Sequence, residues 1–164
     1  MKNSPFIVRK GTSQDVPAAM QLIRELAEYE KAPHEVTATE ESMKEDGFGK
    51  NPIFEMWVAE MDDSIVGLAL TYMRYSTWKG KMLYLEDIVV TESARGQKIG
   101  RSLFLEVCKK VQHENLNGLV WQVLDWNEPG LHFYRKFNAT LDPEWINGKL
   151  LPAAIDKILK DESI

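Results

Sequence analysis

One stretch decides the fold: Leu85-Glu86-Asp87-Ile88-Val89-Val90-Thr91-Glu92-Ser93-Ala94-Arg95-Gly96-Gln97-Lys98-Ile99-Gly100. It joins an apolar strand to a loop with glycine and basic residues, and the loop opens directly into a helix. Such a loop offers unpaired backbone N–H groups and the positive end of the helix dipole, which together suit a phosphate. The stretch therefore predicts a strand–loop–helix unit with a candidate anion site. A solvated basic loop is the alternative.

Length and composition narrow the class of protein. The 164 residues fit one domain, 1–164, and the net charge of −5 argues against a nucleic-acid partner. A single cysteine, Cys108, excludes an internal disulfide, supplies no metal cluster and favours a reducing compartment. No apolar run has the length of a signal peptide core or a membrane span. We therefore expect a cytoplasmic protein with no metal and no membrane partner.

Outward from this stretch, hydrophobic periodicity predicts alternating strands and helices. Several antiparallel strands precede a strand–helix–strand–helix unit, which predicts an α/β or α+β fold around one sheet. The region after residue 139 is less regular, with candidate strand residues at 141 and 145–146 and a short helix near 155–159. The other expected strands are 6–10, 54–61, 65–75, 81–90 and 119–124, and the expected helices are 16–30, 39–46, 99–114 and 127–137.

Two carboxylates, Glu86 and Asp87, interrupt the otherwise apolar strand 81–90. Burying a charge is costly, so these groups are expected to line a wet cavity or hold a partner. Neighbouring strand residues point to opposite faces, so only one of the pair can face a given site unless a bulge intervenes. Eight further carboxylates between residues 25 and 46 form either a field that attracts a cationic substrate or solvated helix faces.

A second motif, Trp126-Asn127-Glu128-Pro129-Gly130-Leu131-His132-Phe133-Tyr134, begins a predicted helix. Asn127 and Tyr134 are seven residues apart and therefore lie along one helix face. The Tyr134 hydroxyl can either donate a proton to a leaving group or satisfy a hydrogen bond in the core.

Together these motifs resemble those of the GCN5-related N-acetyltransferase (GNAT) superfamily, and within it the spermidine/spermine (diamine) N-acetyltransferase group. The resemblance extends from Ile7 to about Ala139. It implies one mixed, mostly antiparallel sheet of about six to seven strands with splayed central strands and helices on both faces. It rests on the two motifs quoted above and on Ile23-Arg24-Glu25-Leu26-Ala27-Glu28-Tyr29-Glu30, Glu45-Asp46-Gly47-Phe48-Gly49 and Leu83-Tyr84-Leu85-Glu86-Asp87.

The resemblance implies acetyl-CoA as the donor cosubstrate and a primary amine as the acceptor. It places the pantetheine arm along the strand, where backbone groups of Ile88 and Val90 would pair with its amides. The pyrophosphate would lie on the N–H groups from Gly96 to Arg101, and Asn127 with its following residues would contact the cofactor further along. The implied cofactor-binding residues are Ile88, Val89, Val90, Arg95, Gly96, Gln97, Lys98, Ile99, Gly100, Arg101, Asn127, Pro129 and Gly130.

By the same resemblance, Tyr134 matches the general acid that protonates the departing thiolate. An amine attacks only when neutral, so Glu86 could remove its proton, directly or through water. The resemblance also suggests a homodimer with acceptor sites near the subunit boundary. The implied acceptor-binding residues are Tyr29, Glu30, Trp78, Glu86, Asp87 and Glu144.

The chain departs from the family pattern at three places. Lys98 stands where the family loop has glycine, at a cost of about 1 kcal/mol if the position needs a positive φ. Ser76 stands where the diamine group has an aspartate, which weakens the case for a long polyamine. The segment after Asn138 is shortened and aligns loosely.

The sequence therefore predicts an acetyl-CoA-dependent N-acetyltransferase acting by direct attack of a small cationic amine, such as a polyamine, a diamine or a lysine analogue. A second hypothesis keeps the chemistry but takes a protein lysine or N-terminus as acceptor. A third hypothesis is a CoA-binding protein without turnover.

Overall fold

The structure is a computed structural model that describes residues 5–160. It divides into two compact units, Met1–Gln122 and Val123–Ile164, and each is described by itself. A single domain over residues 1–164 stays a prediction. The first unit holds one sheet of five strands: β1 (Phe6–Lys10), β2 (Glu55–Met61), β3 (Ser64–Ser76), β4 (Gly80–Val90) and β5 (Leu119–Trp121).

The strands follow the chain order β1-β2-β3-β4-β5 across the sheet. The first three pairings are antiparallel and the pairing of β4 with β5 is parallel, with α3 (Ile99–His113) as the crossover. The predicted mixed, mostly antiparallel sheet is therefore confirmed.

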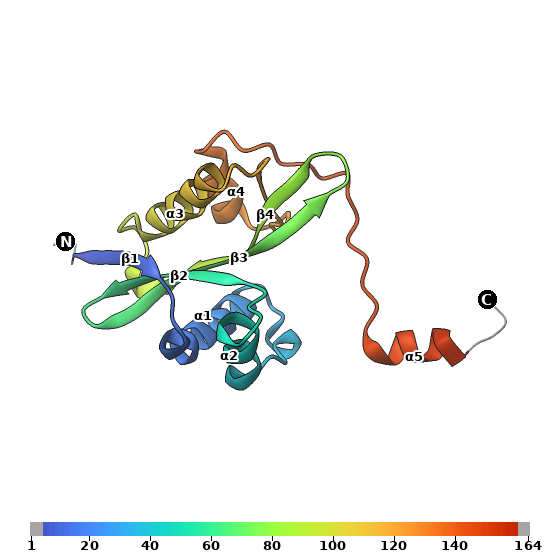
Figure 1. Cartoon of the computed structure of the whole chain (residues 1–164). Helices are drawn as coiled ribbons and strands as arrows, with labels where there is room; N and C mark the ends of the chain where they lie inside the picture. The colour runs from blue at the N-terminus through green and yellow to red at the C-terminus, as the bar shows by residue number, and fades with distance from the viewer. Residues whose placement is uncertain (1–4, 161–164) are drawn as a thin grey trace. The chain divides into compact units, whose positions relative to one another are not determined.

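Helices cover both faces of this sheet, as predicted. Figure 1 shows α1 and α2 below one face and α3 above the other. The second unit contains α4 and α5. The bounds of these helices are α1 (Val16–Tyr29), α2 (Glu40–Phe48), α4 (Glu128–Arg135) and α5 (Pro152–Lys160).

Each sheet face has its own hydrophobic core. On the α1 side, Leu68 and Leu70 of β3 and Val89 of β4 pack in one buried cluster with residues of α1 and α2. On the α3 side, Gly67 permits a close approach, because a Cβ there would lie 3.1 Å from Leu103 and 3.2 Å from Ile99. The alternation of β3 residues between these two cores fixes which face each of its side chains occupies.

A β-bulge interrupts the pairing of β3 with β4. Leu70 pairs with Asp87, whereas the next β3 residue, Thr71, pairs with Leu85, so Glu86 is the extra residue. A bulge changes which side chains share a face and sharpens the local twist. It therefore decides the orientation of the two carboxylates.

The pairing of β4 with β5 is short. It covers only Leu83 to Leu85 on β4, whereas β4 itself continues to Val90. The predicted splaying of the central strands is confirmed, and β5 ends at Trp121 instead of the expected residue 124. The backbone of β4 beyond Leu85 has no strand on this side among residues 5–160.

The predicted number of strands, six to seven, is wrong, because the described part of the chain forms five. Residues 139–151 carry apolar side chains but no strand, since a strand needs a hydrogen-bonded neighbour and none pairs with them here. The predicted helix near residues 155–159 is confirmed by α5. Across the described residues, every helix is too short or too polar to cross a membrane.

Candidate active site

Three carboxylates gather on the α1 side of β4. Burial raises the pKa of Asp87 to about 6, with further contributions from the negative charges of Glu86 and Glu30. Burial also raises the pKa of Glu30, which follows the last residue of α1. Asp87, with a pKa of about 6, can hold an ammonium group and can also take up its proton near neutral pH.

The bulge is what allows both members of the acidic pair to act together. Asp87 lies opposite Leu70, which packs in the α1-side core, so Asp87 is on that side of the sheet. Glu86 is exposed and acts electrostatically on Asp87 and on Tyr72, which is also on that side. In a regular strand, neighbours would point to opposite faces.

Two tyrosines that the sequence reasoning missed flank this pair. The rings of Tyr72 and Tyr84 stack with centroids 5.0 Å apart, and the guanidinium carbon of Arg74 lies 5.7 Å from the Tyr84 centroid. Burial, together with the neighbouring Glu86 carboxylate, raises the pKa of Tyr72 to about 12. The pairing register of β3 with β4 places them beside the acidic pair, and that register is seen only in the structure.

The end of α1 also approaches the loop before α3. The ring of Tyr29 lies beside the Arg95 guanidinium, whose carbon is 5.8 Å from the ring centroid. Tyr29, predicted to contact the acceptor, therefore has a cation of the loop before α3 as a neighbour, whereas Glu30 lies near Asp87.

The last residues of β4 present backbone groups at the open side of the strand. Thr91 donates its N–H to Val66 of β3, and backbone groups alternate along a strand, so those of Ile88 and Val90 point away from β3. The Val90 carbonyl accepts a hydrogen bond of 3.0 Å from Arg95 Nε. Val89 has its side chain in the α1-side core, so only its backbone is available to a ligand.

The loop before α3 has two residues in the left-handed region. Gly96 has φ 79° with open space around its Cα, and Lys98, the N-cap, has φ 67° and ψ 8°. Ser102 donates its N–H to the Lys98 carbonyl, so the N–H groups of residues 99–101 have no acceptor within the helix. The Gln97 side-chain oxygen is buried without a hydrogen-bond partner, so Gln97 faces inward.

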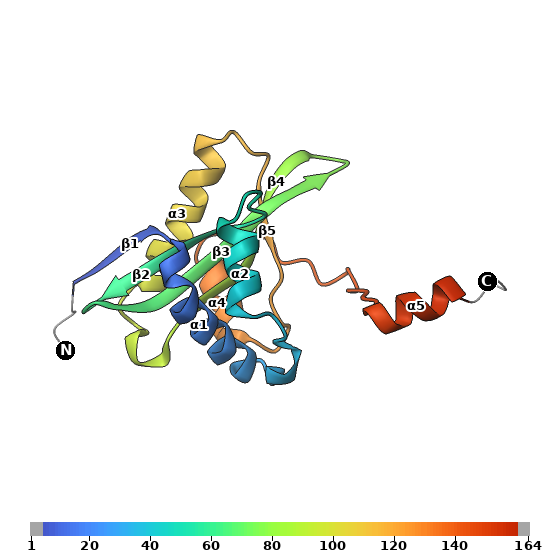
Figure 2. The ribbon, with the colours of Figure 1, turned by 60° about the horizontal axis from the view of Figure 1, so that its bottom comes forward.

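The hairpin that joins β3 and β4 carries Trp78. Figures 1 and 2 show this hairpin projecting beyond α1 and α2. Trp78 is 84% exposed, and the Ser76 hydroxyl accepts hydrogen bonds from the N–H groups of Trp78 (3.3 Å) and Lys79 (3.2 Å). The serine that replaces the aspartate of the diamine group therefore stabilises the turn.

The second unit contains the remaining predicted site residues. Asn127 caps α4 by accepting the Gly130 N–H at 3.0 Å, and a Cβ on Gly130 would lie 2.8 Å from the Asn127 side chain. Pro129 is in the first turn, where its missing N–H costs no hydrogen bond. Tyr134 is buried, with its ring edge-on to Phe133 at 5.2 Å. These residues have clear structural roles in α4.

Glu144 lies in the irregular segment between α4 and α5. Its side chain is exposed, and its backbone N–H donates to the Asp142 carboxylate at 2.9 Å. Its predicted contact with the acceptor stays a prediction.

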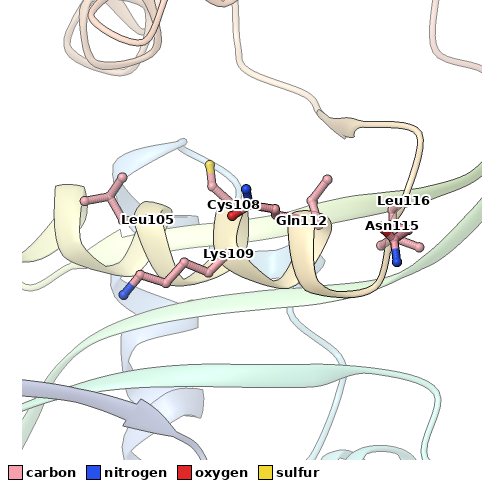
Figure 3. Close-up of a pocket in the computed structure, with 7 residues that line it drawn as sticks. Leu105, Cys108, Lys109, Gln112, Asn115 and Leu116 are labelled. Atoms are coloured by element: carbon pink, nitrogen blue, oxygen red, sulfur yellow. The ribbon is translucent and has the colours of Figure 1, made fainter.

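A separate hollow of about 510 Å³ runs along the outer side of α3 (Figure 3). Its lining includes one thiol, Cys108, whose pKa is raised by burial, but no carboxylate. Over residues 5–160 no cluster of three or more His, Cys, Asp or Glu side chains could hold a metal ion. The hollow is lined by Leu105, Cys108, Lys109, Val111, Gln112, Asn115 and Leu116.

Solved structures agree with this fold. The integron cassette protein from the mobile metagenome of V. cholerae superposes with a TM-score of 0.76, covering 95% of this chain and 98% of that chain. The two sequences are 20% identical, so the likeness concerns the fold alone.

Sequence relatives extend the likeness. The thialysine N-epsilon-acetyltransferase of Mus musculus is 38% identical over 140 residues, which span 80% of this chain and 82% of that protein. The spermidine/spermine N(1)-acetyltransferase-like protein 1 of Homo sapiens is 32% identical over 82% of this chain and 20% of that protein. The family model described as Acetyltransferase (GNAT) family matches residues 19–139. The chain therefore belongs to the GNAT acetyltransferases, a family of acyltransferase enzymes, and the resemblance to the spermidine/spermine group is confirmed.

Proposed function

We propose that this enzyme transfers the acetyl group of acetyl-CoA to the primary amine of a small cationic acceptor, such as a polyamine, a diamine or a lysine analogue. The observation that carries the proposal is the carboxylate cluster around Asp87, whose pKa is raised to about 6. Relatives named for thialysine and for spermidine/spermine acetylation support a small amine as the acceptor.

The acidic pair would first bind the acceptor as an ammonium ion and then accept a proton from it. Negative charge from Glu30, Glu86 and Asp87 favours the cation. Loss of the proton gives the neutral amine that can attack. Asp87 supplies a base with a pKa near the working pH, and Glu86, predicted as the proton acceptor, can share the proton with it through water.

The backbone of β4 and the loop before α3 fit a phosphorylated cosubstrate with an amide-bearing arm. The open edge at Ile88 and Val90 suits the amides of the arm, and the first-turn N–H groups of residues 99–101 suit a pyrophosphate. Arg95 and Arg101 add positive charge, and Gly96, which has no Cβ and has open space where one would stand, leaves room for close approach. Acetyl-CoA supplies the acetyl group as a thioester.

In this proposal the amine nitrogen forms a bond to the acetyl carbon, and the carbon–sulfur bond breaks with its electron pair on sulfur. Tyr134 donates its hydroxyl proton to that sulfur, and the carboxylate pair holds the proton removed from the amine. Asn127, Pro129 and Gly130 would position the cosubstrate through α4. We also propose a homodimer, as in the family the chain resembles.

Replacing Lys98 by glycine should increase the free energy of unfolding by up to about 1 kcal/mol, because glycine adopts a φ of 67° without strain. The same change should weaken acetyl-CoA binding by about threefold, since it removes a cation beside the phosphates. Thermal unfolding and calorimetric titration measure the two effects.

Lys98→Met is the matched control, because it removes the charge and keeps the strained φ. It should weaken binding to the same extent without the gain in stability. Unchanged affinity in both variants would mean that Lys98 does not contact phosphate, and a less stable Lys98→Gly would contradict the strain.

The activity itself is tested by release of free CoA with a panel of amines. We expect turnover with at least one polyamine, diamine or lysine analogue, and none with amide-blocked versions of the same molecules. Turnover only with peptides would favour a protein lysine or N-terminus as acceptor. Acetyl-CoA binding without CoA release across the whole panel would favour a binding protein without turnover.

A further inference from the structure

Arg74 places a positive charge on the same side of the sheet as the acidic pair. Leu70, Tyr72 and Arg74 alternate along β3 and therefore share the face that carries the α1-side core. Asp87 lies opposite Leu70, and Tyr84 lies opposite Tyr72. One face of the hairpin thus runs from a negative end at Asp87 to a positive end at Arg74.

The guanidinium group is held in place by packing. Its carbon lies 5.7 Å from the Tyr84 ring centroid, and Tyr84 stacks in turn on Tyr72 at 5.0 Å. Arg74 is exposed, and within residues 5–160 no carboxylate oxygen lies within 4.0 Å of it. Its planar fork of N–H donors is suited to a carboxylate and remains available to a ligand.

The two charged ends lie within reach of one small amino acid. Arg74 is four residues along β3 from the position opposite Asp87, which corresponds to about 13 Å between backbone positions at ~3.3 Å per residue. The Arg74 guanidinium lies over the ring of Tyr84, which pairs with Tyr72 and is therefore closer to Asp87, so the gap between the charged groups is shorter than the backbone spacing. Extended lysine, with about 7 Å between its side-chain nitrogen and its carboxylate carbon, is of a size to lie in this gap.

We infer that Arg74 determines specificity by binding the carboxylate of an amino-acid acceptor while its distal amine lies at Glu86 and Asp87. The inference rests on the proposed function and narrows its acceptor to molecules that carry an anionic group. A diamine of the same length would instead place its second ammonium group against the guanidinium, where like charges repel.

The test compares L-lysine with 1,5-diaminopentane, which differ only in the carboxylate. The wild-type enzyme should show the higher kcat/KM for lysine. Arg74→Met should lower kcat/KM for lysine about tenfold, the value expected for one solvent-accessible charged hydrogen bond, and raise it for the diamine. Arg74→Lys keeps the charge and should retain a preference for lysine.

Lys81→Met is the matched control, since Lys81 is an exposed cation opposite Tyr75 on the other face of the same hairpin. It should leave the ratio of the two kcat/KM values unchanged. Equal losses for both acceptors in Arg74→Met, or an unchanged ratio, would overturn the inference and leave the acetyltransferase proposal intact. Absence of CoA release from the wild type with every amine would overturn both.

Discussion

Replacing Tyr134 by phenylalanine should lower kcat by about 100-fold or more, the usual contribution of a positioned general acid. The change removes one oxygen and keeps the ring, so the edge-on contact with Phe133 is preserved. The affinity for acetyl-CoA should stay nearly constant, because the hydroxyl is proposed to act on the leaving sulfur during the reaction. Steady-state rates and a binding titration check the two parts.

Tyr75→Phe provides the control, since Tyr75 is 73% exposed on β3 and has no proposed role. It should keep the wild-type rate. A Tyr134→Phe enzyme with full kcat would show that the general-acid assignment is wrong. If Tyr134→Phe lowers the melting temperature, and the loss of activity equals the loss of folded enzyme, the hydroxyl stabilises the packing of α4 instead.

Replacing Asp87 by asparagine should lower kcat/KM by about 10- to 100-fold at pH 7.5, because a base and an ammonium-binding charge are lost together. In the wild type, kcat/KM should fall as the pH drops through about 6, where Asp87 takes up a proton in the free enzyme. The asparagine variant should lack this limb. A pH profile of kcat/KM for both enzymes measures it.

The same substitution should stabilise the free protein. The pKa of Asp87 is raised from 3.8 to about 6 on folding, so the folded state binds more protons than the unfolded state between these values. Stability therefore falls as the pH rises through this window, and the cost is fully present above pH 6. Asp87→Asn should add about 1–2 kcal/mol to the free energy of unfolding at pH 7.5 and almost nothing near pH 4.

Asp46→Asn serves as the control, because Asp46 is exposed on α2 and away from the acidic pair. It should change neither activity nor stability. If Asp87→Asn were less stable than the wild type at pH 7.5, the carboxylate would have a favourable partner, and its assignment as a base destabilised by burial would be wrong.

Periodicity was sufficient to predict most of the fold, because each helix and strand has an apolar face that matches its own repeat. The antiparallel strands, followed by a strand–helix–strand–helix unit, follow from that pattern, whereas the helices on both faces of the sheet were implied by the family resemblance. Periodicity did not predict the structure of residues 139–151 correctly. Residues such as Trp145, Ile146 and Leu150 are apolar enough for a strand, but their exposure in the structure reflects the absence of a neighbouring strand, which local sequence does not encode.

The candidate site divides in a similar way. The sequence pattern alone identified Glu86, Asp87 and the basic loop, since charges in an apolar strand and glycines before a helix are visible in the sequence. The face that each carboxylate occupies depends on a bulge, which is defined by the partner strand. Lys98 illustrates the reverse case: its replacement of a family glycine predicted strain, and the structure gives it a φ of 67°.

The bulge at Glu86 also divides β4 into two halves of opposite phase. Before it, even-numbered residues such as Tyr84 face α1, and after it the odd-numbered Asp87 and Val89 do so. A deletion that straightened the strand would shift either the carboxylate or Val89 to the wrong face, and withdrawing a buried valine costs about 1.5–3 kcal/mol. Folding stability thus protects the position of the acidic pair, because a mutation that changes the phase is penalised in the core before any substrate is bound.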